Sequence, residues 1–321
     1  MPFKHHAAHR HQFPRATYRV TNWAAYEASL RQRGSLTIWF CEEAIQAWRA
    51  APRTTRGGQP RYSAVAIETA LTLRALFHLA FRQTEGLIGS LMQMFQLDLP
   101  VPDHTTLSRR ARTLAVLIRP QTTGPLHLLV DSTGLKLSGP GEWLVEKHGC
   151  KTRRSWRKFH VGVDAASGQI VALELTTPDV DDASQVGPLL EQVTAPVERL
   201  IGDGAYDRTD VYAAVAARHS TAAVVAPPRA DAVLGATAET APTQRDRHIQ
   251  AIARNGRMGW QRASGYNERA KVEAAIGRYK QVIGDRLRAH SDEGRRTELV
   301  IAANLLNRMF GLARPSYVRV S

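Results

Sequence analysis

Apolar residues recur with a helical period along the first third of the chain. Between residues 62 and 119 they return every three or four positions, which is typical of amphipathic helices. Ser63 and Thr84 are suited to cap the first two of three predicted helices. Asp103 or Thr105 starts the third, after a proline-containing loop. The pattern therefore predicts an all-helical segment.

The third of these helices combines an apolar face with a basic, hydroxyl-rich face. Three leucines are expected to point inward: Leu107, Leu114 and Leu117. The side chains expected to contact DNA are Thr105, Thr106, Ser108, Arg109 and Arg112. Arginine grips phosphates, and helix N-termini bind them as well. The outline is that of a helix-turn-helix DNA reader, although this segment is equally compatible with a plain helical bundle that has a solvated basic face.

Beyond the helical third, the pattern changes to short apolar runs and alternating positions. Residues 127–130 form an apolar run that ends at Asp131, and 158–164 and 169–176 alternate as the two strands of a hairpin. Residues 198–202 form a further strand. The full expected order is strand, strand, strand, helix, strand, helix, strand, followed by helices. This order predicts a mixed sheet with flanking helices.

Residues 266–280 predict a helix with two separate stripes. The apolar stripe consists of Val272, Ile276, Tyr279 and Ile283, and one face of a core would bury it. At about 100° per residue, four polar side chains share a second stripe roughly 60° wide. They are Tyr266, Arg269, Glu273 and Lys280. Taken alone, the helix is explained most simply by a solvated face with an ordinary i,i+4 ion pair.

The charge of the chain indicates a polyanionic partner. The 321 residues contain 43 Lys and Arg against 29 Asp and Glu, a formal net charge of +14. Much of the excess is arginine, whose planar fork matches phosphate groups. Because other classes of protein are also basic, the charge supports DNA binding without establishing it.

The cysteines and the hydropathy exclude several classes. Cys41 and Cys150 are far apart and form no CxxC pair, which argues against a disulfide framework and a thiolate zinc site and fits a reducing cytosol. No run of eighteen apolar residues occurs, and the N-terminus lacks the apolar core of a secretory signal. We therefore expect a cytoplasmic protein without membrane association.

Three regions are expected along the chain. Residues 1–20 are predicted to be a disordered basic arm, 21–122 a helical domain, and 123–321 a domain built on the mixed sheet. Residues 229–262 lack strong periodicity and are interpreted as a short insertion. Within it, a short basic helix is expected to end at Gly256.

Two aspartates share one setting. Asp131 and Asp203 each end a predicted strand and lead into a glycine-containing loop, and ligands bind at such strand ends in open α/β sheets. With Glu273 as a third acid, they would form an all-oxygen site, which suits Mg²⁺ or Mn²⁺ rather than zinc. Two such ions about 3.5–4 Å apart can activate a nucleophile and stabilise a leaving oxygen in phosphodiester chemistry. Either aspartate alone would more simply be a turn former.

One competing interpretation is a phosphatase. VDSTG followed by GDGAYD resembles haloacid-dehalogenase-type phosphatases, with Asp131 as nucleophile and Asp203 and Asp207 as metal ligands. Thr133 stands where those enzymes usually need an acid. This interpretation also leaves the polar stripe and the net charge unexplained.

The acids and the stripe together resemble another family. Asp131 and Asp203, followed by YxxRxxxExxxxxxK at residues 266–280, are similar to the DDE transposases of bacterial insertion sequences, specifically the group with the Y-R-E-K signature. The resemblance also covers VDSTGLKL, IGDGAYD, NWAAYEASLRQRGSLTIW and PDHTTLSRR, and so spans roughly residues 20–310. It implies a ribonuclease H-like catalytic domain, preceded by a helical domain that binds the terminal inverted repeats of the transposon.

The resemblance also implies roles for individual residues. Asp131, Asp203 and Glu273 would bind two divalent ions, cut a strand at each transposon end and transfer the freed 3′-hydroxyl to target DNA. Arg269 and Lys280 would hold phosphates beside the scissile bond, and Tyr266 would contact the DNA end. The resemblance further implies that the protein binds double-stranded DNA, forms a homodimer on that DNA and is associated with the bacterial chromosome. A non-catalytic DNA-binding regulator is the remaining alternative, since it would need the charge and the helices but none of the three acids.

Overall fold

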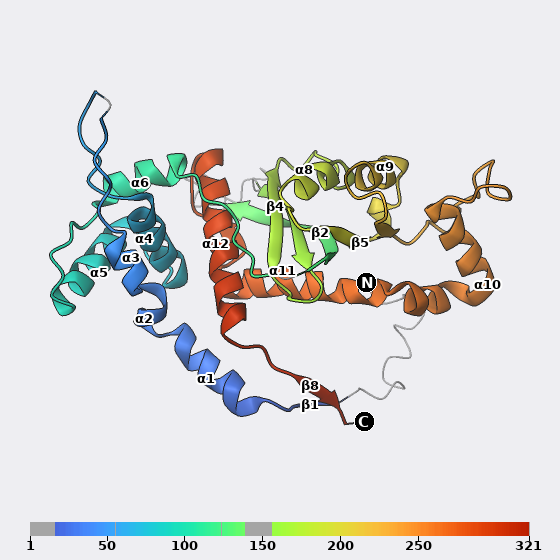
Figure 1. The fold of residues 1–321 in the computed structure, drawn as a ribbon, viewed down its shortest axis with the longest axis horizontal. Helices are drawn as coiled ribbons and strands as arrows, with labels where there is room; N and C mark the ends of the chain where they lie inside the picture. Colours follow the sequence, from blue (N-terminus) through green and yellow to red (C-terminus); the bar gives the residue numbers. More distant parts are fainter. Residues whose placement is uncertain (1–16, 55, 123, 139–155, 321) are drawn as a thin grey trace, which may run out of the picture.

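A mixed sheet forms the centre of the computed structural model, which describes residues 17–54, 56–122, 124–138 and 156–320 (Figure 1). Its strands are β2 (Leu126–Leu137), β3 (Trp156–Asp164), β4 (Ile170–Thr176), β5 (Val197–Ile201), β6 (Ala223–Val225) and β7 (Arg286–Leu287). They lie in the order β4-β3-β2-β5-β6, and β7 pairs with β2. β3 pairs with both β2 and β4 in an antiparallel arrangement. On the other side, β5 runs parallel to β2, and β6 runs parallel to β5.

The predicted order of strands and helices is confirmed, but the first strand is longer than expected. We predicted a run that ends at Asp131; instead β2 continues through Asp131 to Leu137. The second half of β2 has partners on both sides, since Thr133 faces Phe159 of β3 and Lys136 faces Arg286 of β7. These partners are distant in sequence, which explains why the polar stretch after Asp131 was interpreted as a turn.

Helices cover both faces of the sheet. The helices α8 (Val186–Glu191) and α9 (Thr209–Arg218) lie on one face, and α11 (Ala270–Val282) and α12 (Asp292–Leu312) on the other (Figure 1). Alternation along β2 separates the two cores, since Leu128 and Val130 join the α8–α9 side while Leu129 and Leu135 join the α11–α12 side. Asp131 and Thr133 therefore interrupt the apolar face that α11 covers.

The predicted helix at 266–280 starts with a tighter turn than expected. Residues Tyr266–Arg269 form a 3₁₀ turn, η4, and the α-helix α11 begins at Ala270. Its predicted apolar stripe faces the sheet, with Val272 and Tyr279 buried. Both belong to the core cluster on this side, and Ile276 and Ile283 pack against it half-buried.

The stretch interpreted as an insertion contains a longer helix than predicted. Helix α10 spans Gln244–Ser264, and Thr243 caps it by accepting a hydrogen bond from the Asp246 amide. Gly256 does not end it but forms a kink, with φ of 69°, a value that glycine adopts without strain. Figure 1 shows α10 at the end of the molecule far from α4 and α5.

The N-terminal helices pack on α12. They are α1 (Trp23–Arg33), α2 (Leu36–Trp39), α3 (Glu42–Gln46), α4 (Ala64–Leu76), α5 (Phe81–Met94) and α6 (His104–Thr113). Their core includes Ile301, Leu305 and Met309 of α12, which stands between these helices and the sheet (Figure 1). On its sheet side, the buried Asn307 of α12 donates to the carbonyl and accepts from the amide of Ile170, both at 2.8 Å.

Two details of the helical region differ from the prediction. Thr84 lies inside α5, where its hydroxyl donates to the Ala80 carbonyl, rather than capping the helix. The third helix ends at Thr113, so Leu117 is 76% exposed and does not face inward. Ser63 and Asp103 do cap α4 and α6, respectively.

The predicted proline-containing loop before the basic helix is confirmed, since residues 95–103 connect α5 to α6. The sharper turn of the helical region lies one step earlier, where α4 meets α5 at an angle of 112°. Within the described residues, no single helix is long and apolar enough to cross a membrane, and only this bent pair passes that test jointly.

The first and last strands of the described residues pair in a small second sheet. Strand β1 (Tyr18–Val20) pairs with β8 (Tyr317–Arg319) in an antiparallel arrangement. The end of the predicted disordered arm, residues 18–20, is thus a strand, and its first sixteen residues lie outside the described part of the chain. Its partner is the basic C-terminal segment, almost three hundred residues away.

Candidate functional site

Asp131 and Asp203 lie next to each other because their strands are parallel neighbours. β2 pairs with β5 in a register that places Leu129 opposite Ile201. Each aspartate follows two residues later on its own segment. The predicted strand-end position is thus correct for Asp203, which follows β5, and wrong for Asp131, which lies in mid-strand. The two acids lie close together as predicted, because the register of the parallel strands brings them side by side whether or not β2 ends at Asp131.

Backbone amides orient both aspartates. Asp131 accepts a hydrogen bond on Oδ1 from the Ser132 amide at 2.9 Å, and Asp203 accepts one on Oδ1 from the Ala205 amide at 2.8 Å. Asp203 also stands as the N-cap of the short 3₁₀ turn Gly204–Tyr206. In both residues the second oxygen, Oδ2, is left to face the centre of the site.

Glycine is required directly before Asp203. A Cβ atom at Gly202 would lie 2.6 Å from Cδ2 of Tyr206, closer than van der Waals contact permits. The Tyr206 ring cannot move away easily, since it is 1% exposed and belongs to the core beneath α8 and α9. This contact sets the path of the loop that carries Asp203.

One guanidinium group contacts all three acids. Nη2 of Arg269 lies 3.0 Å from Oδ2 of Asp131 and 3.7 Å from Oδ2 of Asp203, and Nη1 donates to Oε1 of Glu273. We call Asp131, Asp203 and Glu273 the acid cluster. Arg269 ends η4 and Glu273 lies one turn later in α11, so the i,i+4 spacing brings both to the same side of the helix.

The three acids differ in their exposure to solvent. The side chain of Asp131 is 16% exposed, against 41% for Asp203 and 54% for Glu273. Burial raises the pKa of Asp131 above its ordinary value, and the nearby Arg269 offsets this only in part, while the other two acids add to it. Asp131 is thus the member of the cluster whose charge most needs a cationic partner.

Lys280 and Tyr266 flank the acid cluster. Lys280 donates from Nζ to Oγ1 of Thr133 at 2.6 Å, which places its ammonium beside β2. Tyr266 is half-buried, and its ring lies against Trp260 with the centroids 5.5 Å apart. Arg269, Glu273 and Lys280 of the predicted polar stripe therefore face the middle of β2, where Asp131 lies, and Tyr266 is near enough to feel the charges of Arg269 and the acids. Trp260 is a core residue and is not available to stack on a DNA base, because its side chain is 2% exposed and donates to His248.

Helix α11 is held in place by aromatic and apolar packing. Tyr279 packs on Phe159 with centroids 5.1 Å apart, and Phe159 faces Thr133 across β2 and β3. Val272 is fully buried one residue before Glu273. These contacts fix the rotation of α11 and so direct its polar stripe toward the acid cluster.

The donor chemistry of the acid cluster suits divalent ions. Its members offer only carboxylate oxygens, the ligands preferred by Mg²⁺ and Mn²⁺. Among the described residues, no set of three His, Cys, Asp or Glu side chains is already spaced as a metal cage. The Arg269 guanidinium lies between the acids instead and draws the three carboxylates to one point. The residues thus fit a metal once that guanidinium moves.

The N-terminus of α6 is occupied by a carboxylate. Both oxygens of Asp103 accept hydrogen bonds from the backbone amides or hydroxyls of Thr105 and Thr106. These bonds, led by that of the Thr105 hydroxyl, hold the pKa of Asp103 well below its usual range. A phosphate at this helix end would have to compete with the Asp103 carboxylate for these donors, so the DNA contacts of Thr105 and Thr106 stay a prediction.

The basic face of α6 is accessible. Arg109 and Arg112 are exposed, and Ser108 is half-buried. A groove beside α6 is lined by Ser108 and Arg112 together with Arg288 and His290, which precede α12. The predicted DNA-contacting residues of α6 thus continue into a second basic segment that the sequence pattern did not single out.

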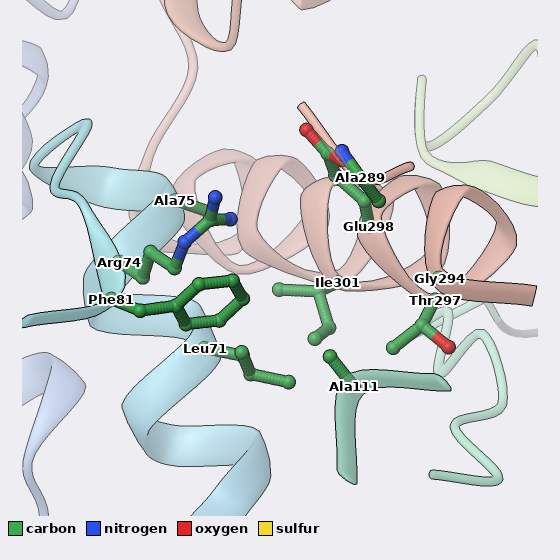
Figure 2. A pocket seen from close by; sticks show the side chains of 10 residues that line it. All are labelled: Leu71, Arg74, Ala75, Phe81, Ala111, Ala289, Gly294, Thr297, Glu298 and Ile301. Atoms are coloured by element: carbon green, nitrogen blue, oxygen red, sulfur yellow. The ribbon is translucent and has the colours of Figure 1, made fainter. Parts of the chain in front are cut away.

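A small apolar pocket lies apart from the acid cluster. Figure 2 shows Leu71, Phe81 and Ile301 around it, with the Arg74 guanidinium over the Phe81 ring at 4.3 Å. Its volume of about 40 Å³ suits only a few water molecules. Glu298 in its wall is committed to the backbone amides of residues 288 and 289. We interpret this pocket as a small packing defect where α4, α5, α6 and α12 meet, and not as a ligand site.

Sequence reasoning missed a buried polar group on the opposite face of the sheet. His160, in the middle of β3, is fully buried, and its Nδ1 lies 3.6 Å from Oδ1 of Asp182. Among the described residues, neither His160 Nδ1 nor the Tyr206 hydroxyl has a hydrogen-bond partner, while the same oxygen of Asp182 forms an ion pair with Nζ of Lys158 at 3.1 Å. Burial lowers the pKa of His160 to about 4 and raises that of Tyr206. A histidine between the apolar residues Phe159 and Val161 of a predicted strand was the available signal.

The phosphatase interpretation does not agree with the geometry. It needs Asp207 as a metal ligand, but the side chain of Asp207 is 1% exposed and pairs with Arg245 at 3.1 Å. Thr133, at the position where an acid would be required, is bonded to Lys280.

Comparison with solved structures returns transposases at low similarity. The piggyBac transposase, in a cryo-EM synaptic complex with hairpin DNA, matches with 10% identity and a TM-score of 0.40 over 92% of this chain and 78% of that chain. The Mos1 strand transfer complex matches with 11% identity and a TM-score of 0.21 over 82% of both chains. Similarity at this level carries no argument about the site.

Comparison with protein families is decisive. A family model described as "Transposase DDE domain" matches residues 122–308, and a second model with the same description matches residues 31–140. The first covers more than half of the chain, including every member of the acid cluster. The phosphatase and the non-catalytic regulator are thereby set aside. The protein belongs to the DDE transposase family, whose members catalyse DNA cleavage and strand transfer.

Proposed function

We propose that this chain is an insertion-sequence transposase of the Y-R-E-K group and that the acid cluster is its catalytic centre. The observation that carries the proposal is the contact of one side chain, Arg269, with all three acids. These residues come from β2, the loop after β5 and α11. A structural ion pair would need one acid, whereas three acids around one cation form a site suited to divalent ions.

The fold supports a ribonuclease H-like catalytic domain. An antiparallel set of three strands, β2 to β4, is extended by the parallel strands β5 and β6, with helices on both faces. We propose residues 123–321 as this domain and residues 21–122 as the part that binds the terminal inverted repeats. Helix α12 would connect the two parts rigidly, because its side chains pack in the hydrophobic cores of both.

In this proposal, each residue of the site has a separate task. The cluster would hold two Mg²⁺ or Mn²⁺ ions through its carboxylate oxygens. When bound, such ions supply an activated nucleophile and neutralise the charge that develops on the phosphate. The protein orients Asp131 and Asp203 through the backbone amides of Ser132 and Ala205, so little reorganisation is needed during the reaction.

The cationic side chains around the cluster are proposed to position DNA. Arg269 and Lys280 would contact phosphates beside the scissile bond, and Tyr266 the transposon end. Ser108, Arg109 and Arg112 on α6 would contact the backbone of the inverted repeat. A net charge of +14 favours such contacts. Joining two transposon ends implies a homodimer on DNA, and we place the protein on the bacterial chromosome in the cytoplasm.

The test separates binding from cleavage. Asp131→Asn, Asp203→Asn and Glu273→Gln are expected to bind inverted-repeat DNA like the wild type while Mg²⁺-dependent nicking falls by at least about 10³-fold. Glu268→Gln is the matched control, since Glu268 lies beside Arg269 in η4 but pairs with Lys271 at 3.4 Å. Nicking by Glu273→Gln at the wild-type rate would show that the three-acid centre is wrong.

A further inference from the structure

We propose that Arg269 is an internal counter-ion for the acid cluster: it holds the three carboxylates together before a divalent ion binds, and the ion must displace it. The inference rests on the proposed function, because it takes the acid cluster to be the metal site. It goes further by making metal loading and the release of a DNA-binding arginine one coupled event.

The first step of the argument is the choice of oxygen atoms. Oδ1 of Asp131 and Oδ1 of Asp203 are committed to backbone amides. The oxygens that remain are the two Oδ2 atoms, and both face Nη2 of Arg269 at 3.0 and 3.7 Å. Each Oδ1 shares a lone pair with a backbone amide, whereas neither Oδ2 does, so we expect a metal ion to bind the two Oδ2 atoms first. Arg269 and a divalent ion would then compete for the same atoms.

The second step is the charge of the site. Three carboxylates that share one site repel one another, and a mostly buried carboxylate such as Asp131 is costly without a cation. Arg269 supplies a charge that cannot be lost by deprotonation, and its planar fork has enough donors for several carboxylates. With Arg269 in place, the cluster keeps a formal charge of about −2, which still attracts a divalent cation.

The third step concerns the freedom of the arginine to leave. The side chain of Arg269 is 15% exposed, and among the described residues its buried Nε has no hydrogen-bond partner. The hydrogen bonds of its two Nη atoms go to Asp131 and Glu273. Once a divalent ion neutralises these acids, the guanidinium has no strong partner in its present position. A DNA phosphate beside the cluster would then be its natural acceptor.

The test measures metal binding without DNA. The full chain is titrated with Mn²⁺ alone, and free Mn²⁺ is followed by electron paramagnetic resonance. Arg269→Gln is expected to bind Mn²⁺ about tenfold more tightly than the wild type, within the range of coupling between competing ligands. In EDTA the same variant is expected to melt at a lower temperature, and saturating Mn²⁺ is expected to raise its Tm more than that of the wild type.

A control separates competition from a general change in charge. Lys280→Gln also removes one positive charge near the cluster, but Lys280 is bonded to Thr133 and not to an acid. It is expected to change the Mn²⁺ Kd much less than Arg269→Gln. Equal effects of the two variants would overturn the counter-ion proposal and leave only a diffuse field effect.

The remaining outcomes distinguish this inference from the proposed function. If Asp131→Asn abolishes Mn²⁺ binding while Arg269→Gln leaves the Kd and the Tm in EDTA unchanged, only the counter-ion proposal fails. If Asp131→Asn binds Mn²⁺ like the wild type, the three-acid metal site fails with it. Should Arg269→Gln not fold in EDTA, Arg269→Lys decides, because its single ammonium reaches fewer carboxylates. Its Kd is expected below the wild-type value, and an unchanged Kd overturns the proposal.

Discussion

Lys280 and Thr133 are joined by a hydrogen bond of 2.6 Å, although 147 positions separate them in the sequence. Thr133 lies two residues beyond Asp131 on the same face of β2, so this bond places an ammonium group next to the acid cluster without neutralising it. Together with Arg269, it ties α11 to the middle of the central strand. The site thus has one cation, Arg269, that is paired with the acids and one, Lys280, that is bonded to a neutral hydroxyl.

Lys280→Ala is expected to weaken binding to transposon-end DNA at every salt concentration. Loss of one phosphate contact reduces the slope of log K against log salt by about one. Fluorescence anisotropy between low and moderate salt measures this slope. Thr133→Val, which removes the acceptor but keeps the charge, is the control and is expected to leave the slope unchanged. An unaltered slope in Lys280→Ala would place Lys280 outside the DNA contact.

Gly202→Ala is expected to destabilise the fold and to reduce cleavage further than the loss of stability explains. The new Cβ would overlap the buried Tyr206 ring, at a cost of about 1–3 kcal/mol, and would displace Asp203. Urea unfolding and a nicking assay measure the two effects. In the matched variant Gly204→Ala, the nearest atom is the Pro227 carbonyl oxygen at 3.4 Å. Equal behaviour of the two variants would contradict the steric argument.

Gly277→Ala is expected to stabilise the free protein while weakening DNA cleavage. Gly277 is exposed inside α11, and a Cβ added there would meet no atom within 4 Å, so alanine raises helix stability by about 0.5–1 kcal/mol. Cleavage should fall if DNA approaches the backbone here, beside Glu273. Gly187→Ala in α8, on the opposite face of the sheet, is the control, since it adds a methyl group without facing DNA. A Gly277→Ala variant with normal cleavage would show that DNA stays clear of this position.

The protein is expected to lose stability in mild acid because of the buried His160. Burial lowers its folded-state pKa to about 4, below the unfolded value of 6.5. Since the unfolded chain binds the proton first, the stability contributed by neutral His160 is complete above pH 6.5 and is lost as the pH falls toward 4. The effect is on the order of 3 kcal/mol at most. Urea unfolding between about pH 4 and 7.5 should show a shallower pH dependence for His160→Gln than for the wild type. Identical slopes would mean that another group is responsible.

Short-range patterns predicted much of the fold. Each strand from β2 to β6 has its own apolar or alternating run, so their order could be predicted before any contact was known. The stripe on residues 266–280 follows from helix geometry, and Val272 and Tyr279 are buried as expected. Ser63 and Asp103 cap their helices through bonds that span three residues or fewer. All of these features depend on neighbours within about one turn of helix or one strand.

Errors occurred where a distant partner decides the local structure. The polar half of β2 becomes a strand because β3 and β7 pair with it, and no nearby residue signals this. Leu117 is apolar yet exposed, because α6 ends before reaching it.

The sequence by itself determined that Arg269 and Glu273 share one face of a helix and that Asp131 and Asp203 follow apolar runs, because both facts depend only on the geometry of regular elements. Only the tertiary structure decided that these four side chains meet. The parallel register of β2 and β5 brings the aspartates together, and the packing of Val272 and Tyr279 turns α11 toward them. Three carboxylates from separate segments of the chain are thereby gathered around the guanidinium of Arg269. No local pattern contains this arrangement.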